Sequence, residues 1–244
     1  MKLLIDAGNT RIKWSVVDGS GGWLRSGNLP VGQASELPKL FADLQGVQQI
    51  WVSNVAGEEI ALHIRDIFAG RLIQPRFIVA QEAQYGVRNG YSSAAQLGSD
   101  RWAALIAAWH LVQGKCLVVN CGTAITVDAL SAQGEFLGGL ILPGIELMQH
   151  SLAVATNQLK TGQVGQGKYI QFPQNTADAL FSGAIQAGCG AIQRQHALLG
   201  DAGAPVVLSG GSAGVLQENL NLPLRVVDNL VLQGLLLISQ ESNK

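Results

Sequence analysis

The chain has 244 residues, enough for one large domain or two small ones. Hydrophobic residues make up 48% of the sequence and charged residues only 14%, which favours a compact, enzyme-like body with extensive buried surface. A net charge of −1 without a Lys/Arg-rich tract argues against nucleic acid or an anionic membrane as a partner. Asp6 interrupts the first apolar run after three residues, unlike a signal peptide, and no run approaches the ~18 apolar residues that span a bilayer.

Alternating and continuous apolar segments predict the elements of the first part of the chain. Strands are expected at 3–5, 12–17, 23–29, 49–52 and 76–79. Helices are expected at 35–44, 58–68 and 100–112. The polar, aromatic and Gly-containing stretch from 84 to 98 is expected to be a loop.

The second part of the chain continues with the same alternation of strands and helices. Strands are expected at 117–119, 125–130, 136–142, 206–208 and 224–227. Helices are expected after Gly144 through Leu152, from Thr176 as N-cap to Leu199, after Gly211, and at 230–238. The Gly- and Gln-rich segment 160–175 is expected to be a loop. The order of elements predicts a central sheet with helices on its faces in each half.

The three cysteines are Cys116, Cys121 and Cys189, an odd number without CxxC spacing. This pattern predicts reduced, buried thiols and a cytoplasmic protein. The four histidines show no metal-ligand spacing, so neither a metalloenzyme nor a serine hydrolase has support; they are His63, His110, His150 and His196.

An internal repeat relates the first strand pair to a later one. Asp6-Ala7-Gly8-Asn9-Thr10 separates the first two strands, and Asn120-Cys121-Gly122-Thr123 separates a second pair. An offset of 114 residues places Asp6 on Asn120, Gly8 on Gly122, Asn9 on Thr123, Ile12 on Thr126 and Val16 on Leu130. The repeat predicts two related halves that face each other across a cleft.

The first of these turns has the residue types that bind phosphate. Gly8 allows close approach of the backbone, Asn9 and Thr10 offer hydrogen-bond donors, and Lys13 adds a positive charge. Asp6 is placed to hold a hydrated divalent cation. An ordinary hairpin turn explains this motif as well, but the second turn, with Thr123 and Thr126, favours a nucleotide clamped between two halves.

Two further motifs carry candidate chemistry. In Gly98-Ser99-Asp100-Arg101, at a helix start, Asp100 can accept a proton and Arg101 can bind a carboxylate; the alternative is an acidic residue that stabilises the first helical turn. Ser209-Gly210-Gly211-Ser212 follows a strand and could let a base or ribose lie against the backbone, although such glycine pairs are common in strand-to-helix turns.

The ordered set of motifs over nearly the whole chain resembles the type III pantothenate kinase family. The motifs are DAGNTRIKW, YxxxxxLGSDRW from Tyr91 to Trp102, NCGTAITVDAL, GGLILPG and NTADALFSG. That family belongs to the acetate/sugar kinase–Hsc70–actin superfamily. The resemblance implies an α/β fold of two ribonuclease-H-like (actin-like ATPase) halves, 1–97 and 98–244, each a mixed sheet flanked by helices, with an ATP cleft between them.

By this resemblance, the chain would phosphorylate pantothenate at its primary hydroxyl with ATP and Mg²⁺, the first step of coenzyme A biosynthesis. Asp100 would be the general base, and Asp6 would hold Mg²⁺ through water. ATP and its phosphates would be bound by Asp6, Ala7, Gly8, Asn9, Thr10, Arg11, Ile12, Lys13, Thr123, Gly210 and Gly211. Pantothenate would be bound by Tyr91, Gly98, Ser99, Asp100, Arg101 and Thr176. Members are homodimers, and the helix 102–112 is a candidate for the interface.

The sequence departs from the family at Asn120, where members usually have an Asp that ligates a monovalent cation, K⁺ or NH₄⁺. Asn keeps a carbonyl oxygen but loses the charge, so we hypothesise a weakened K⁺ dependence. Two alternatives stay open: another small-molecule kinase of the superfamily, such as an acetate, sugar or polyphosphate enzyme, and a non-enzymatic transcriptional regulator. The GSDR motif with Tyr91 and Thr176 argues against the first, and the near-neutral charge argues against direct DNA binding.

Overall fold

The computed structural model describes residues 1–156 and 164–241. The chain forms two compact units, one of Met1–His110 with the C-terminal segment from Asn229, the other of Leu111–Asp228. The division expected from the sequence, between 97 and 98, differs from these units in two ways. Helix α3 (Ser99–Val112) lies mostly in the first unit, and the last helix, α7 (Leu230–Glu241), returns to it.

The first unit contains a five-stranded sheet in the order β3-β2-β1-β4-β5. Its strands are β1 (Lys2–Ala7), β2 (Arg11–Val17), β3 (Trp23–Pro30), β4 (Gln49–Asn54) and β5 (Pro75–Phe77). The central strand β1 is antiparallel to β2 and parallel to β4. All five strands confirm the segments expected from the sequence. The apolar runs of β1, β2 and β4 are mostly buried, whereas the edge strands β3 and β5 are more exposed.

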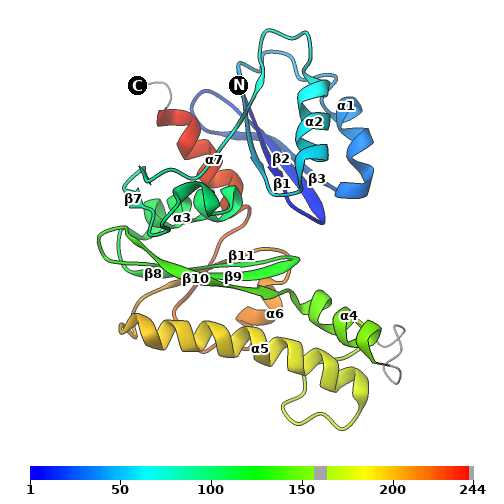
Figure 1. The fold of residues 1–244 in the computed structure, drawn as a ribbon, viewed down its shortest axis with the longest axis vertical. Coiled ribbons are helices and arrows are strands. Elements are labelled where there is room, and N and C mark those ends of the chain that lie inside the picture. The colour runs from blue at the N-terminus through cyan, green and yellow to red at the C-terminus, as the bar shows by residue number, and fades with distance from the viewer. Residues whose placement is uncertain (157–163, 242–244) are drawn as a thin grey trace. The chain divides into compact units, whose positions relative to one another are not determined.

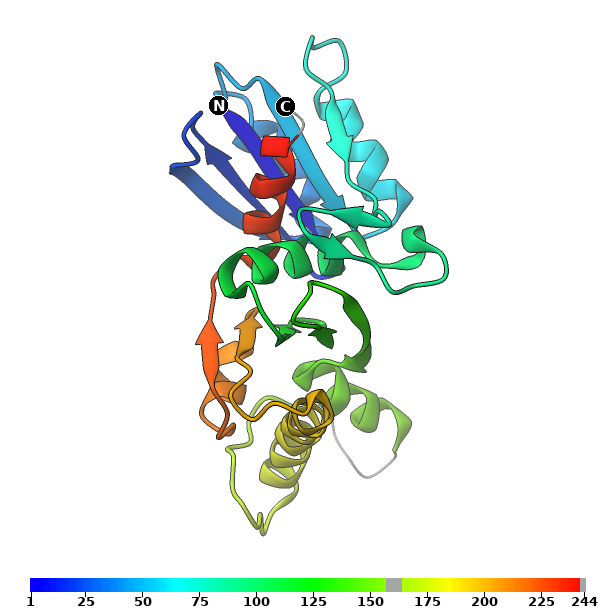
Figure 2. The ribbon, with the colours of Figure 1, turned by 90° about the vertical axis from the view of Figure 1, so that its left-hand side faces the viewer.

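Helices cover both faces of this sheet. On one face, Leu3 and Ile5 pack with Phe41, Ile64 and Phe68 from the segments around α1 (Leu37–Leu40) and α2 (Glu58–Ile67). On the other face lies α7, which crosses the sheet in Figure 2. A hydrogen bond from Lys2 Nζ to Ser239 Oγ, at 2.9 Å, ties α7 to β1. Gly234 lets α7 pack closely on α3, because a Cβ there would lie 1.9 Å from the Ala103 carbonyl oxygen.

Two segments of the first unit differ from the expectation. The helix expected at 35–44 is reduced to the 3-10 helix η1 (Val31–Glu36) and a single α turn. Pro38, the second residue of α1, has no backbone N–H to continue an α-helix from the preceding residues, and Phe41 already leaves helical geometry. The loop expected at 84–98 contains a small hairpin, β6 (Ala83–Gln84) and β7 (Val87–Arg88), and the 3-10 helix η2 (Ala94–Gln96). Positive φ at Tyr85 and Gly86 makes the tight turn of this hairpin.

The second unit repeats the first. Its sheet has the order β10-β9-β8-β11-β12, with the same sequence of antiparallel and parallel neighbours. The strands are β8 (Cys116–Cys121), β9 (Ala124–Leu130), β10 (Phe136–Pro143), β11 (Val206–Ser209) and β12 (Leu224–Val226), and the helices are α4 (Ile145–Ala155), α5 (Thr176–Leu199) and α6 (Ala213–Gln217). Figure 1 shows the long α5 running along its sheet. The α/β fold with a duplicated sheet is thus confirmed.

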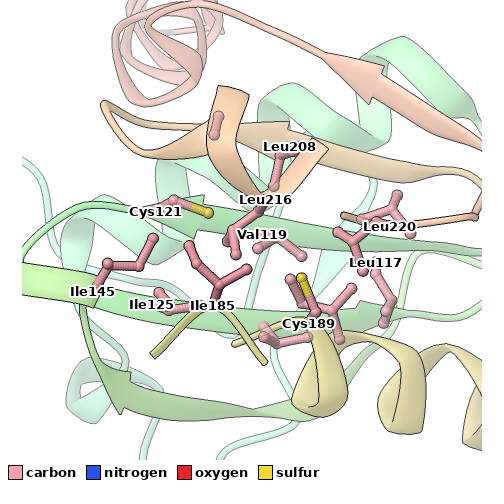
Figure 3. Packing of buried hydrophobic residues seen from close by; sticks show 14 of the residues in the cluster. Leu117, Val119, Cys121, Ile125, Ile145, Ile185, Cys189, Leu208, Leu216 and Leu220 are labelled. Carbon is pink, nitrogen blue, oxygen red and sulfur yellow. The ribbon is translucent and has the colours of Figure 1, made fainter. Parts of the chain in front are cut away.

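The core of the second unit lies between its sheet and these helices. In Figure 3, Val119 and Ile125 of the sheet face Ile185 and Cys189 of α5, with Leu216 of α6 beside them. Burial raises the pKa of the Cys189 thiol to about 11 and keeps it in its neutral form. The expected character of the cysteines is confirmed: all three, Cys116, Cys121 and Cys189, are free and buried.

The long helix α5 begins at Thr176, one residue earlier than expected. Asn175, not Thr176, is the N-cap, and its Oδ1 accepts a hydrogen bond from the backbone N–H of Asp178 at 2.9 Å. The helix ends, as expected, at Gly200, whose φ of 70° is the left-handed geometry of a C-cap. Residues 164–175 form turns and irregular structure, as expected for the loop 160–175; residues 160–163 lie outside the described part of the chain.

The two repeats have different turn lengths. Ala7 pairs with Ile12 across residues 8–11, whereas Cys121 pairs with Ile125 across residues 122–124. The second turn is one residue shorter, so the fixed offset of 114 fails beyond the turn. The equivalence of Ile12 with Thr126 was therefore wrong: Ile12 corresponds to Ile125, and Lys13 to Thr126.

Candidate active site

The first turn presents backbone and short polar side chains at the end of β1. The Gly8 N–H donates to the Arg11 carbonyl at 3.1 Å, which closes the turn. Asn9, Thr10 and Arg11 are exposed, whereas the side chains of Ala7 and Ile12 are buried in the core. Of the residues expected to bind phosphate, Ala7 and Ile12 can therefore offer only their backbone groups.

Arg11 has a partner that the sequence did not indicate. Its Nε donates to Asn28 Oδ1 of the neighbouring strand β3 at 2.9 Å, and its Nη2 donates to the same oxygen. This contact holds the guanidinium beside the first turn. Arg11 is exposed and remains accessible to an anion.

Asp6 lies at the end of β1 with Lys13 of β2 and Ser53 of β4 as its two sheet partners. Paired residues of a sheet project from the same face. Burial, helped by the negative charge of Asp100 and opposed by Lys13, raises the pKa of Asp6 to about 7. The positive charge near the Asp6 carboxylate therefore does not balance the two negative charges of Asp6 and Asp100. This imbalance favours the binding of a metal ion.

Asp100 occupies the first turn of α3. The backbone N–H of Arg101 donates to Asp100 Oδ1 at 2.8 Å, and a Cβ on Gly98 would lie 2.6 Å from that same oxygen. A side chain at residue 98 would therefore displace the carboxylate of Asp100 from this position. Burial raises the pKa of Asp100, and the hydrogen bond and charge of Arg101 oppose this shift.

Arg101 and Tyr91 form one cluster with α3. Arg101 Nη1 donates to the Tyr91 hydroxyl at 3.1 Å, and the guanidinium carbon lies 5.9 Å from the centre of the Tyr91 ring. Arg101 is only 6% exposed. A buried guanidinium of this kind suits a carboxylate ligand, which it can bind through two parallel hydrogen bonds.

The loop that carries Tyr91 is anchored on α3. Trp102 Nε1 donates to Gln84 Oε1 at 3.1 Å, and Gly86 leaves no room for a Cβ beside the ring of Trp109. Arg101–Ala108 of this helix are buried in the chain itself. The expectation that helix 102–112 contributes to a subunit interface stays a prediction, and the exposed part of this helix is its end, with His110 and Leu111.

Ser53 is a residue of this site that the sequence analysis did not select. Its hydroxyl lies 3.0 Å from that of Ser99, the first residue of α3, and both side chains are buried. The available signal was a hydroxyl that directly follows the buried apolar run 50–52.

The second turn is closed by glycines from three segments. The Gly122 N–H donates to the Ala124 carbonyl at 2.9 Å, and the Gly144 N–H donates to the Thr123 carbonyl at 2.8 Å. Gly210 has a φ of 104° and its missing Cβ would lie 2.3 Å from the Cys121 carbonyl oxygen. The structure thus brings the expected residues Thr123, Gly210 and Gly211 to one end of the second sheet. Gly144, which directly follows the last residue of β10, is an addition.

The two direct sheet partners of Asn120 are neutral. They are Thr126 of β9 and Ser209 of β11, both buried hydroxyl residues. Within residues 1–156 and 164–241, no cluster of three or more His, Cys, Asp or Glu side chains could hold a metal ion. A monovalent cation at Asn120 would therefore meet uncharged oxygens from these three side chains.

Thr176 is the first residue of α5 and is exposed. It belongs to the second unit, while Tyr91, Asp100 and Arg101 belong to the first. Its contact with pantothenate stays a prediction.

In the described residues, no helix has both the length and the apolar character to cross a bilayer.

Comparison with known proteins supports one family. The family model for type III pantothenate kinase matches residues 2–197. A type III pantothenate kinase of Nitrosospira multiformis is 48% identical over 245 residues, covering 99% of this chain and 92% of the relative.

Solved structures show the same fold at lower identity. A protein of Campylobacter jejuni assigned to the Baf family of transcriptional activators has a TM-score of 0.62 and 24% identity, covering 99% of this chain and 100% of that one. A protein of Sinorhizobium meliloti assigned as a 2-dehydro-3-deoxygalactonokinase has a TM-score of 0.61 and 16% identity, covering 100% and 99%. At these identities the two structures are similar in fold alone.

Proposed function

Because this chain belongs to the type III pantothenate kinase family, we infer that it transfers a phosphoryl group from ATP to pantothenate, the first step of coenzyme A biosynthesis. It is an enzyme, a phosphotransferase with an alcohol as acceptor. The observation that carries the proposal is the cluster of Asp100, Arg101 and Tyr91 beside the turn that carries Asp6. A general base, a carboxylate-binding cation and a phosphate turn thus occur in one unit.

Asp100 is proposed as the general base. A carboxylate whose pKa is raised by burial accepts a proton more readily than one in water. Gly98 and the Arg101 N–H restrict its side chain, so one carboxylate oxygen is held and the other remains available to the acceptor hydroxyl. Phosphoryl transfer depends mainly on positioning and charge neutralisation, so this restriction is as important as the pKa.

Arg101 is proposed to bind the carboxylate of pantothenate. It is the neighbour of Asp100 on α3, so one helical turn carries both the base and the group that fixes the distal end of the substrate. Its bond to the Tyr91 hydroxyl orients the guanidinium. Gly98, Ser99 and Thr176 are the further pantothenate contacts that the motif comparison implies.

The first turn is proposed to bind the phosphates of ATP. The groups offered are Lys13, the exposed Asn9, Thr10 and Arg11, and the backbone of residues 7–12. A kinase of this family uses ATP with a divalent metal, and we propose Mg²⁺ held through water by Asp6. The donor set fits, because Asp6 and Asp100 together are deficient in positive charge. The bound cation would neutralise charge on the transferring phosphate.

The turn of the second unit is proposed to contact ATP through Thr123, Gly210 and Gly211. Gly210 has a positive φ and no space for a side chain, so at this position the chain presents only backbone to a base or ribose. K⁺ or NH₄⁺ at Asn120 is proposed to bind weakly, because the oxygens there are uncharged. A homodimer and a cytoplasmic location are further expectations from the family.

The test is ATP turnover with and without pantothenate. We expect turnover to depend on pantothenate, and we expect Asp100→Asn to lower kcat by at least ~100-fold, the low end of general-base contributions, while ATP still binds. Asp66→Asn, at an exposed position of α2, is the matched control and should retain activity. Turnover that is indifferent to pantothenate would favour another kinase or a regulator with this fold. Near-normal kcat in Asp100→Asn would remove Asp100 from the base role.

A further inference from the structure

A buried pair of serines joins the sheet of the first unit to the start of α3. Ser53 Oγ and Ser99 Oγ lie 3.0 Å apart, and Ser53 is 0% exposed. The Ser99 hydroxyl also lies 3.4 Å from the carbonyl oxygen of Asn54, the last residue of β4. If Ser99 donates to that carbonyl, its lone pairs accept the Ser53 proton, and both hydroxyls are satisfied.

This pair connects the two elements that adjoin the carboxylates of the site. Ser53 is the parallel sheet partner of Asp6, so the two side chains project from the same face of the sheet. Ser99 directly precedes Asp100 on α3. One hydrogen bond between side chains therefore connects the strand next to Asp6 with the helical turn that carries Asp100.

We propose that Ser53 is a positioning residue for phosphoryl transfer: it sets the place of Asp100 relative to the phosphate-binding turn of Asp6. The inference rests on the proposed function. Ser53 is too deeply buried to touch a substrate, so it acts through Ser99. In-line transfer requires the acceptor hydroxyl and the phosphate to be aligned, and a displacement of about 1 Å can lower a rate by ~100-fold.

The second unit shows what is particular to this serine. Ser209 occupies the equivalent place beside Asn120 and is also buried. A serine at this strand position is therefore a feature of both repeats. In the first unit, Ser53 also makes a hydrogen bond with Ser99, on the helix that carries Asp100. The role assigned to Ser53 arises from Ser99 and Asp100, not from the strand alone.

The chain provides a matched control. Ser15 of β2 is also 0% exposed, and its hydroxyl lies 2.6 Å from that of Ser26 on β3. Ser15→Ala thus removes a serine–serine hydrogen bond of the same unit, between the buried Ser15 and the exposed Ser26, that does not involve α3. Comparison of the two alanine variants separates a loss of alignment from a general loss of stability.

The experiment measures kcat, the KM for ATP, the KM for pantothenate and the thermal midpoint of Ser53→Ala, Ser15→Ala and the wild type. We expect Ser53→Ala to lower kcat by about tenfold or more while the KM for ATP changes by less than about threefold. Ser15→Ala should keep the wild-type kcat. Ser53→Thr, which retains a hydroxyl, should recover most of the loss. Adding Ser53→Ala to Ser99→Ala should lower kcat little beyond the loss in Ser99→Ala alone, because the bond between the two serines is already absent.

The outcomes separate the two claims. A wild-type protein without pantothenate-dependent turnover would overturn the proposed function. An active wild type, with kcat of Ser53→Ala unchanged, would overturn only the positioning role. A loss of kcat that follows the thermal midpoint equally in Ser53→Ala and Ser15→Ala would also overturn it, because the effect would then be one of stability.

Discussion

The two turns at equivalent places of the two sheets have the same backbone framework and different chemistry. In the first, Asp6 has Lys13 and Ser53 as its sheet partners; in the second, Asn120 has Thr126 and Ser209. The serine is common to both turns. The charged pair Asp6 and Lys13 is replaced by the neutral pair Asn120 and Thr126. The two turns thus share the same arrangement of paired strands, whereas charged side chains occupy these positions in the first turn only.

The two turns also differ in how they are held. A Cβ on Gly8 in the first turn would meet one backbone oxygen at 3.3 Å, a contact that small shifts can relieve. At the second turn, Cβ atoms on Gly144 and Gly210, which pack against the turn from other segments, would lie 2.2 and 2.3 Å from backbone oxygens, whereas a Cβ on Gly122, the equivalent of Gly8, would lie 3.9 Å from its nearest atom. The first turn therefore contributes mainly charge, and the second mainly a tightly packed backbone surface. Each of the following experiments tests one side of this contrast.

The largest effect is expected when the first turn is made like the second. Asp6→Asn keeps the shape and removes the charge that would hold a hydrated cation, so kcat should fall by ~100- to 1,000-fold, as when a transition-state electrostatic contact is lost. Asn120→Ala should lower kcat by less than about tenfold, since no charge is removed there. Steady-state kinetics at saturating ATP and pantothenate measures both. A greater loss in Asn120→Ala would reverse the assignment of charge to the first turn.

The packed backbone of the second turn predicts a second, mainly steric effect. A Cβ in Gly144→Ala would collide with the Gly122 and Thr123 carbonyl oxygens, so the turn must move. We expect the KM for ATP to rise by at least ~tenfold and the free energy of unfolding to fall by about 1–3 kcal/mol.

The controls for Gly144 are two other glycines. Gly183→Ala on α5 has open space around its Cβ and should be neutral or slightly stabilising. Gly8→Ala in the first turn should change the KM for ATP less than Gly144→Ala does. Equal effects at Gly8 and Gly144 would contradict the distinction between a charged and a packed turn.

The raised pKa of Asp6 predicts a pH-dependent stability with a definite sign. Its pKa is about 7 in the folded protein and about 3.9 in an unfolded chain. Between these values the folded state binds more protons, so the stabilising contribution of the protonated carboxyl is lost as pH rises toward 7 and beyond. Asp6→Asn lacks this loss. Its thermal midpoint, relative to the wild type, should rise by several degrees from pH 5 to pH 8 without ligands.

Asp18 gives the opposite sign and serves as the control. Hydrogen bonds from Ser20 and Gly22 lower the pKa of Asp18, so its charged form stabilises the fold above the unfolded pKa. Asp18→Asn should therefore lose stability relative to the wild type as pH rises through the acid range. If Asp6→Asn instead follows the pattern of Asp18→Asn, the carboxyl of Asp6 is not buried as described.

The sequence was informative wherever the determinant is local. Apolar runs located the strands of both sheets, and the GSDR motif located the start of α3 with Asp100. The sequence was insufficient where strand register or contacts between segments determine which residues are neighbours. A fixed offset cannot reveal that the second turn is one residue shorter, so the equivalence of Lys13 with Thr126 required the register. Ser53 and Gly144 escaped notice for the same reason: their partners, Ser99 and Thr123, lie across the sheet or in another segment.

The smallest effect concerns the missing charge of the second turn, and it tests the contrast from the other direction. Asn120→Asp places a carboxylate beside the hydroxyls of Thr126 and Ser209, so the turn should acquire a site for K⁺. A unit charge at about 4 Å contributes ~1 kcal/mol even in water, so K⁺ should stimulate this variant at least ~fivefold over Na⁺. The wild type should respond by less than about twofold, because neutral oxygens compete poorly with water for the ion. Titration of activity with K⁺ against a Na⁺ background decides the matter. A strong, saturable K⁺ requirement in the wild type would show that Asn120 needs no charge to hold the ion, and the two turns would then be more alike in function than their residues suggest.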